Sequence, residues 1–199
     1  MEAAAVEPIV CPFIVAVDTN EGAPWTFQGM VDNASGRPIV VRTRYMSLGR
    51  HPVGRGDYSI VGLTDEIGIE RKSIEDLIGT VLGWQTRYEK ENGIPGRRER
   101  FAKEHENLAQ LKCSAVIVEG TIEQVLNSVD QYGERSVAEN RTAINRTFLS
   151  WQCIRHRVPW LLFDSRRWAE IEAFRLLDLY WREHVPAKKR KAITKSYES

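Results

Sequence analysis

Residues 56–76 read GDYSIVGLTDEIGIERKSIED, and they contain two acids and a lysine spaced for a common site. Two apolar runs, 57–62 and 66–72, are joined by a polar turn, which is typical of a β-hairpin. Side chains alternate between the faces of a strand, so Glu70 and Lys72 share one face while Arg71 lies on the other. If the two runs pair, Asp57 can approach the face that carries Glu70 and Lys72. The stretch therefore predicts two carboxylates and one ammonium group on a single hairpin.

Asp57 and Glu70 offer the oxygen ligands that a hard cation prefers. Mg²⁺ binds carboxylates and keeps several of its waters, so a two-acid site with open coordination positions suits Mg²⁺ or Mn²⁺. A lysine beside such a metal can orient an attacking water and offset the charge that builds on a phosphate. The pattern predicts metal-assisted cleavage of a phosphodiester.

Size and composition are those of an ordinary globular protein. The 199 residues are enough for one domain with a full core, and 42% are hydrophobic and 28% charged. The formal net charge is +1, so any surface for nucleic acid has to be local. The cysteines Cys11, Cys113 and Cys153 show no CxxC spacing, which argues against a disulfide scaffold and against a zinc module.

The first residues, MEAAAVEP, lack the basic segment of a signal peptide. The first apolar run, 9–17, contains Pro12 and is too short to span a bilayer. We expect a cytoplasmic protein of a bacterial or phage-infected cell, or a nuclear one in a eukaryote, without membrane contact.

Apolar periodicity along the chain predicts an α/β fold around one mixed sheet. Besides the hairpin, strands are expected at 9–17, 39–45, 115–118 and 159–163. Helices are expected at 74–82, 97–112, 122–129, 138–156 and 167–184. Ser73 is a suitable N-cap for the first of these helices. We expect residues 1–8 to form a flexible leader and residues 186–199 a disordered basic tail.

The hairpin belongs to a longer ordered pattern. Gly56-Asp57-Tyr58, Glu70-Arg71-Lys72 and Asp76 resemble the GDx(n)ERKx3D signature of XPF/Mus-type structure-selective endonucleases, in the PD-(D/E)xK nuclease superfamily. The run 18–21 is similar to that family's D-x-R-E element, with Asn20 where arginine is usual, and the run 116–120 is similar to its strand closing in E-G. The resemblance covers roughly residues 9–185. It implies a restriction-endonuclease-like fold, a central mixed sheet flanked by helices on both faces.

The resemblance also implies roles for the matching residues. Asp57 and Glu70 would bind the metal, with Lys72 as the catalytic lysine. Asp18 and Glu21 would line the same site, Asp18 as a further metal ligand. A strand-end acid such as Asp18 is also typical of a simple turn.

Three further residues belong to the expected site or its surroundings. Asp76 would hold the geometry from the first helical turn, and it also has the ordinary role of an acid at a helix N-terminus. Arg71 is expected to stiffen the hairpin by an ion pair with an acid such as Asp76. Glu119 is either a distant member of the acid cluster or a plain strand end.

Basic residues fall in three groups that could contact DNA phosphates. The residues we expect to bind DNA are Arg97, Arg98, Arg141, Arg146, Lys188 and Lys189. A run of charge is equally typical of an ordinary solvated surface. Trp84, Trp151 and Trp160 are expected in the core and not as stacking platforms for bases.

The resemblance implies an endonuclease that cuts branched DNA, such as flaps, forks or junctions, in repair or recombination. The expected products carry 5′-phosphate and 3′-hydroxyl ends. Family members usually append a tandem helix-hairpin-helix region, which this sequence does not contain, so a protein partner could supply the grip on DNA. A homodimer is a further expectation. Two alternatives stay open: a non-catalytic DNA-binding or scaffolding subunit, and a nuclease of the superfamily that acts on linear DNA.

Overall fold

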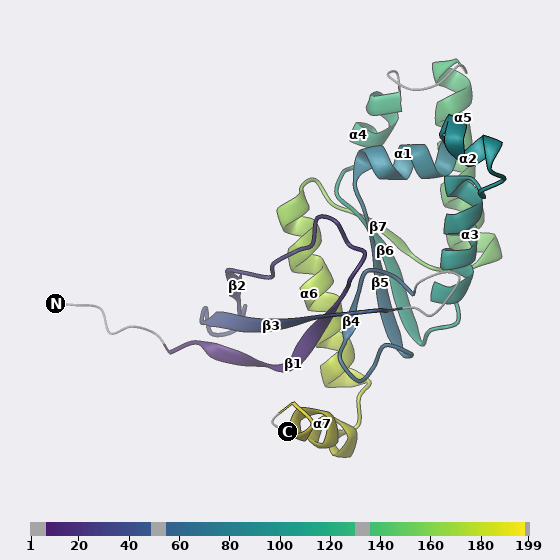
Figure 1. The fold of residues 1–199 in the computed structure, drawn as a ribbon. Coiled ribbons are helices and arrows are strands. Elements are labelled where there is room, and N and C mark those ends of the chain that lie inside the picture. The colour runs from purple at the N-terminus through teal and green to yellow at the C-terminus, as the bar shows by residue number, and fades with distance from the viewer. Residues whose placement is uncertain (1–6, 49–54, 130–135, 198–199) are drawn as a thin grey trace.

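The computed structural model describes residues 7–48, 55–129 and 136–197. Within them, a mixed sheet in the order β2-β3-β1-β4-β5-β6-β7 runs through the molecule, as Figure 1 shows. The strands are β1 (Ile9–Asp18), β2 (Met30–Val31), β3 (Pro38–Met46), β4 (Tyr58–Ile60), β5 (Ile67–Lys72), β6 (Cys113–Val118) and β7 (Trp160–Leu162). The helices are α1 (Ile74–Leu82), α2 (Arg87–Glu91), α3 (Arg97–Leu108), α4 (Ile122–Ser128), α5 (Val137–Leu149), the π-helical turn η2 (Ser150–Arg155), α6 (Arg166–Glu183) and α7 (Ala187–Lys195).

The predicted hairpin is present at the centre of this sheet. β4 and β5 pair antiparallel with Tyr58 opposite Ile69. β4 also pairs antiparallel with β1, which runs parallel to β3 on its other side. β5, β6 and β7 are parallel to one another. The expected mixed sheet and its strands are confirmed.

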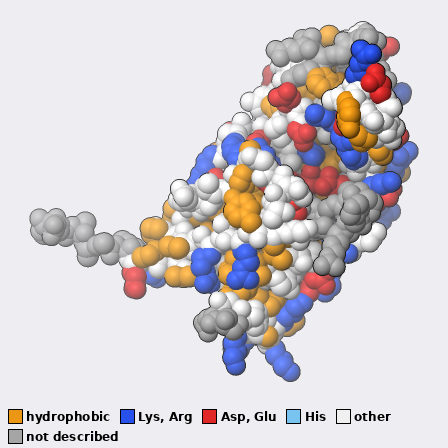
Figure 2. Space-filling model, in the orientation of Figure 1, with side chains coloured by type: hydrophobic (Ala, Val, Ile, Leu, Met, Phe, Trp, Pro, Cys, Tyr) orange, Lys and Arg blue, Asp and Glu red, His pale blue; other side chains and the backbone are white. Residues whose placement is uncertain are grey.

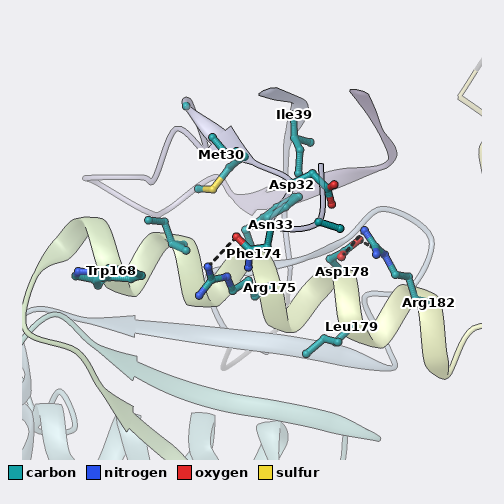
Figure 3. A pocket seen from close by; sticks show the side chains of 14 residues that line it. Met30, Asp32, Asn33, Ile39, Trp168, Phe174, Arg175, Asp178, Leu179 and Arg182 are labelled. Atoms are coloured by element: carbon teal, nitrogen blue, oxygen red, sulfur yellow. Dashed lines mark hydrogen bonds and ion pairs between the residues drawn. The ribbon is translucent and has the colours of Figure 1, made fainter. Parts of the chain in front are cut away.

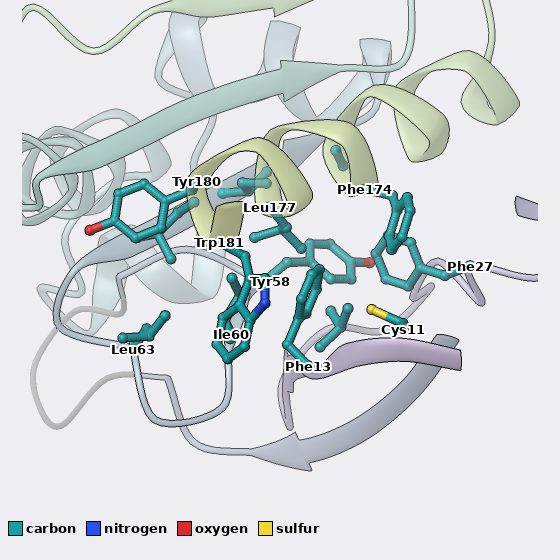
Figure 4. Close-up of a cluster of buried hydrophobic side chains, with 14 of the residues drawn as sticks. Cys11, Phe13, Phe27, Tyr58, Ile60, Leu63, Phe174, Leu177, Tyr180 and Trp181 are labelled. Carbon is teal, nitrogen blue, oxygen red and sulfur yellow. The ribbon is translucent and has the colours of Figure 1, made fainter. Parts of the chain in front are cut away.

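Two apolar cores cover the two faces of the sheet. Along β6, Ala115 and Ile117 face the core under α6, while Val116 and Val118 face the core under α1, α3 and α5. Figure 4 shows the first core, where Phe13, Tyr58 and Leu177 meet. Burying each such side chain is worth about 1.5–3 kcal/mol. The predicted α/β class, with helices on both faces, is confirmed.

Helix α1 begins where the sequence predicts. The Ser73 side chain accepts a hydrogen bond from the Asp76 backbone N–H at 3.1 Å and so caps the first turn. The helix ends at Gly83, whose φ of 76° is left-handed and suits a residue without a Cβ. This cap places Asp76 one turn beyond the end of β5.

The expected disordered tail needs correction. Residues 187–195 form α7, which packs on the sheet through the buried side chain of Ile193. Lys189 pairs with Glu66, and the Tyr197 hydroxyl donates to the Val61 carbonyl at 2.9 Å. Ile193 is the one large apolar side chain of α7 among four lysines and an arginine, which leaves no periodic signal, so the sequence pattern could not reveal this docking. Residues 1–6 of the expected leader lie outside the described residues.

Other elements differ from expectation at their ends. The expected helix 138–156 is α5 followed by η2, and the expected helix 97–112 ends at Leu108. Trp151 and Trp160 are buried, as predicted. No helix in the described parts of the chain is long and apolar enough to cross a membrane.

Candidate active site

Glu70 and Lys72 lie on the face of β5 that α3 covers. Glu70 is 2% exposed and Lys72 is 8% exposed. The Lys72 ammonium donates to Glu70 Oε1 at 2.5 Å and lies 3.1 Å from Asp76 Oδ2. It also sits 4.6 Å from the centre of the Phe101 ring. Burial alone would lower the pKa of Lys72, but the carboxylates of Glu70 and Asp76 outweigh it and raise the pKa.

Asp57 joins this pair at the start of β4. Its backbone N–H donates to the Ile69 carbonyl, and its Oδ2 accepts from the Arg71 backbone N–H, both at 2.8 Å. Burial raises the pKa of Asp57 well above its ordinary value, and the charge of Glu70 raises it further. The structure thus brings Asp57, Glu70 and Lys72 into one electrostatic cluster, as the hairpin predicts.

Gly56 permits this placement. Its φ is +88°, and a Cβ at this position would lie 2.6 Å from the Ile69 carbonyl oxygen. The glycine of the Gly56-Asp57 pair is therefore needed for the backbone to pass close to β5.

Asp18 lies next to Asp57, but both of its carboxylate oxygens accept hydrogen bonds from backbone N–H groups. Its N–H donates to the Asp57 carbonyl at 2.8 Å. Its Oδ1 accepts from the Asn20 N–H and its Oδ2 from the Leu48 N–H, both at 2.7 Å. This is the geometry of a turn-forming acid at a strand end, and the role of Asp18 as a metal ligand stays a prediction.

Arg71 forms the expected ion pair with an acid, but its partners are Glu119 and Glu21. Its Nε and Nη2 donate to the two oxygens of Glu119 at 2.8 Å each, and its Nη1 donates to Glu21 Oε1 at 3.2 Å. Asp76, named as an example of such an acid, is not the partner, because strand alternation turns Arg71 toward α6 while Asp76 lies on the other face with Lys72. Glu21 likewise belongs to the network of Arg71.

Glu119 is the centre of this second network. Besides Arg71, it accepts from the Trp25 indole N–H at 2.8 Å and from Arg166 at 3.0 Å. Burial would raise the pKa of Glu119, but the Arg71 guanidinium outweighs burial and lowers it. Glu119 therefore joins the end of β6 to the loop after β1 and to the start of α6.

Helix α3 contributes Phe101 and Glu104, which the sequence interpretation did not place in the site. Phe101 stacks on the Lys72 ammonium, and Arg97, expected only as a DNA contact, lies 3.7 Å from Asp76. The Glu104 carboxyl contacts Glu70; burial and the charge of Glu70 raise its pKa. An acid inside the apolar stripe of a helix was the available signal for this residue.

The expected DNA-binding residues lie in several places. Arg97 is beside the site, at the N-terminus of α3. Arg98 donates to the Val81 carbonyl and, at 3.2 Å, to Thr147 Oγ1, and so ties α3 to α1 and α5. Figure 2 shows basic side chains at several separate positions on the face drawn.

The remaining expected DNA contacts are equally dispersed. Arg141 donates to the Leu126 carbonyl at 3.1 Å, whereas Arg146 is exposed on α5. Lys188 and Lys189 belong to α7, which lies at the opposite end of the molecule from α5 (Figure 1). The structure does not bring these residues into one patch.

A groove of about 510 Å³ lies elsewhere, between the β2–β3 region and α6 (Figure 3). Met30, Ile39, Trp168 and Phe174 supply much of its apolar lining. None of the residues expected in the active site lines this groove.

The donors for a divalent cation are Asp57 and Glu70. Glu70 Oε2 is buried and accepts no hydrogen bond within the described residues, so one carboxylate oxygen is left for a ligand. Across residues 7–48, 55–129 and 136–197, no group of three or more histidine, cysteine, aspartate or glutamate side chains could hold a metal ion, so the two carboxylates are the donors that the chain offers here. The carboxylate chemistry of this pair fits Mg²⁺ or Mn²⁺.

No family model and no curated protein matches this sequence. Two solved structures are similar to it in fold. XPF from Aeropyrum pernix has a TM-score of 0.47 and 16% identity, over 93% of this chain and 81% of that one. XPF from Aeropyrum pernix in complex with DNA has a TM-score of 0.49 and 15% identity, over 94% of this chain and 82% of that one.

Proposed function

We propose that this protein is an Mg²⁺- or Mn²⁺-dependent endonuclease that hydrolyses phosphodiester bonds of DNA. The observation that carries the proposal is the state of the Glu70 carboxylate. It is almost fully buried, with one oxygen on the Lys72 ammonium and the other without a hydrogen-bond partner among the described residues. Asp57 lies in the same electrostatic cluster. A buried carboxylate with an oxygen that accepts no hydrogen bond destabilises the folded state unless a cation or a proton binds to that oxygen.

Asp57 and Glu70 would hold the metal, and Lys72 would act on the phosphate. When bound, the metal supplies a Lewis acid for the phosphoryl oxygen and lowers the pKa of water. Lys72 keeps its proton because its pKa is raised, so it serves as a positive charge and hydrogen-bond donor and not as a base. Asp76 and the Phe101 ring hold the ammonium at the end of β5. Lys72 can then stabilise the charge that develops on the phosphate.

The proposed substrate is branched DNA, with products that carry 5′-phosphate and 3′-hydroxyl ends. Support comes from the ordered GDx(n)ERKx3D pattern and from the solved XPF structure that contains DNA. We also propose that a second copy of the chain or a protein partner supplies additional grip on DNA, since the basic residues are dispersed. Size-exclusion chromatography with light scattering, with and without DNA, measures whether the chain pairs.

The test is cleavage of labelled flap, fork and linear duplexes with Mg²⁺, Mn²⁺ or EDTA. Asp57→Asn keeps an oxygen for the Arg71 N–H and should cut at least about 100-fold more slowly, as should Lys72→Met. Glu75→Gln, an exposed change beside Asp76 on α1, serves as the matched control and should cut like the unmodified protein.

The outcomes separate the rival functions. Cleavage lost in Asp57→Asn and Lys72→Met, with DNA binding retained, supports the nuclease. DNA binding without cleavage under any metal supports a non-catalytic scaffold and contradicts the proposal. Equal cutting of branched and linear DNA contradicts branch selectivity and favours a nuclease for linear ends.

A further inference from the structure

Strand β3 carries two arginines, Arg42 and Arg44, which lie opposite Ile14 and Ala16 of β1. Ile14 and Ala16 flank Val15, which packs in the core under α6, so their own side chains point to the other face of the sheet. Residues that pair across neighbouring strands project to the same face. Arg42 and Arg44 therefore project from the sheet face opposite α6, and basic side chains lie over β3 on the face drawn in Figure 2.

The proposed active site lies on the same face of the sheet. Tyr58 of β4 and Ile69 of β5 pair with each other and pack in the core under α6. Their neighbours Asp57 and Glu70 therefore belong to the opposite face. β1 alone separates β3 from β4, so with strands about 4.8 Å apart Arg44 lies roughly 10–15 Å from Asp57. That length corresponds to about three or four nucleotide steps of a DNA strand, at roughly 3.4 Å each.

The charges of these two arginines are not neutralised within residues 7–48, 55–129 and 136–197. Both side chains are exposed, and neither forms an ion pair with an acid in those ranges. The Arg42 guanidinium lies 5.9 Å from the centre of the Tyr197 ring, and the Tyr197 hydroxyl donates to the Val61 carbonyl at 2.9 Å. The docked C-terminal segment thus holds Arg42 at this face and leaves its positive charge available.

The outer edge of β3 is also open. β3 pairs with β1 along its length, but with β2 only through its first two residues, so in the described part of the chain the backbone of residues 40–46 has no strand on that side. A second copy that paired antiparallel around Thr43 would set Arg42 of one copy directly against Arg44 of the other. Like charges opposite each other destabilise such a pair. The edge therefore favours an anionic partner, and its backbone N–H groups can also donate to phosphate oxygens.

We propose that Arg42 and Arg44 bind phosphates of the substrate DNA, about three or four nucleotides from the bond that the proposed active site cuts. The inference rests on the proposed function, because it takes DNA as the anionic partner. At this distance the two arginines position the DNA and do not touch the reacting phosphate. They should therefore affect affinity and KM, and leave the rate of the chemical step unchanged.

The test measures the affinity for a labelled flap duplex by fluorescence anisotropy in EDTA, at several salt concentrations. The double variant Arg42→Gln/Arg44→Gln should bind at least about tenfold more weakly at about 0.1 M salt, and its slope of log K against log salt should fall by about 2. With Mg²⁺ and saturating enzyme, its single-turnover rate of cleavage should stay within about twofold of the unmodified protein. Arg42→Lys/Arg44→Lys keeps both charges and should recover most of the affinity.

The matched control removes two exposed arginines elsewhere. Arg155→Gln/Arg157→Gln lies just before β7, at the end of the sheet opposite the proposed active site, and should bind DNA normally. Arg44→Gln alone leaves the contact between Arg42 and Tyr197 intact and should lower the salt slope by about 1. This single variant decides the question even if the double variant is less stable.

The possible outcomes distinguish the inference from the proposed function. Unchanged affinity in the arginine variants, or an equal loss in the control, overturns the inference and leaves the nuclease proposal standing. Loss of self-association with unchanged DNA affinity means that β3 binds a second copy, and it also overturns the inference. Weakened DNA binding by the variants, with no cleavage by the unmodified protein under Mg²⁺ or Mn²⁺, supports the phosphate contacts and contradicts the nuclease proposal.

Discussion

Glu70, Arg71 and Lys72 are consecutive residues, yet their side chains belong to networks on opposite faces of the sheet. Glu70 and Lys72 meet Asp76 and α3, while Arg71 meets Glu119 beside α6. The alternation of β5 produces this separation, because each strand residue points away from the next. The proposed active-site cluster and its structural support are thereby built from three neighbouring positions.

Arg71→Lys tests the supporting network. A lysine cannot make the fork that Arg71 makes to both oxygens of Glu119, and the pair is largely buried. We expect the free energy of unfolding to fall by about 1–3 kcal/mol, measured by urea denaturation. Arg87→Lys, at an exposed ion pair with Glu91, is the control and should change stability by less than about 0.5 kcal/mol. Equal effects of the two substitutions would contradict this assignment.

Gly56→Ala tests the close approach of the backbone to β5. A Cβ at Gly56 meets the Ile69 carbonyl oxygen at 2.6 Å, and its φ of +88° is unfavourable for alanine. The substitution should cost at least about 1 kcal/mol of stability. Gly22→Ala has no atom within 4 Å of the added Cβ and should be nearly neutral in the same thermal or urea unfolding. A neutral Gly56→Ala would show that the hairpin tolerates a wider turn.

At the scale of elements, two helices acquire their roles from the partners they pack on. α3 brings Arg97, Phe101 and Glu104 to the hairpin. α7 is mostly basic, and its position depends on Ile193 and on the pair between Lys189 and Glu66. Helices of this kind are stabilised by tertiary contacts more than by their own sequence.

Glu66 predicts how the docking of α7 depends on pH. Hydrogen bonds from Lys189, then Lys112 and Tyr180, lower the pKa of Glu66 from 4.5 to about 2. A lowered folded pKa means that this stabilisation is full above pH 4.5 and disappears as the pH falls toward 2. We expect a contribution on the order of 1–2 kcal/mol, because both lysines are partly solvated.

Urea unfolding across that pH range provides the measurement. Glu66→Gln should remove part of the loss of stability between neutral and acid pH, so its pH profile should be flatter. Glu123→Gln, an exposed change on α4, should leave the profile of the unmodified protein. Parallel profiles for all three proteins would exclude a role for Glu66 in acid sensitivity.

At the scale of the whole molecule, charge is dispersed and not concentrated. The net charge is +1, and basic side chains occur at separate positions over α3, α5 and α7. Contact with DNA must then depend on a few local phosphate contacts. The salt dependence of binding counts those contacts.

Arg146 and Arg98 are expected to differ in that measurement. Arg146→Ala, on an exposed part of α5, should reduce the slope of log K against log salt by about 1 without loss of stability. Arg98→Ala should instead lower stability by about 1–3 kcal/mol, because Arg98 binds the Val81 carbonyl and Thr147. Fluorescence anisotropy of a labelled duplex at several salt concentrations measures the first effect, and thermal unfolding the second. The reverse pattern would assign the DNA contact to Arg98.

The sequence by itself determined the hairpin, the grouping of Asp57, Glu70 and Lys72, the Ser73 cap and the order of the main strands and helices. These features depend on local rules, namely the alternation of a strand, the periodicity of a helix and the capping of its first turn. The GDx(n)ERKx3D pattern lies within such local elements, which is why it could be read from the chain. Residues close in sequence stay close in the fold.

Only the tertiary structure decided the partner of Arg71, the place of Glu104 and the docking of α7. Each depends on a contact between distant segments: Arg71 with Glu119, Glu70 with Glu104, and Glu66 with Lys189. No local propensity encodes which remote acid or lysine will face a given strand. That choice is made by the packing of two cores on a twisted sheet, where the position of every helix depends on the whole chain.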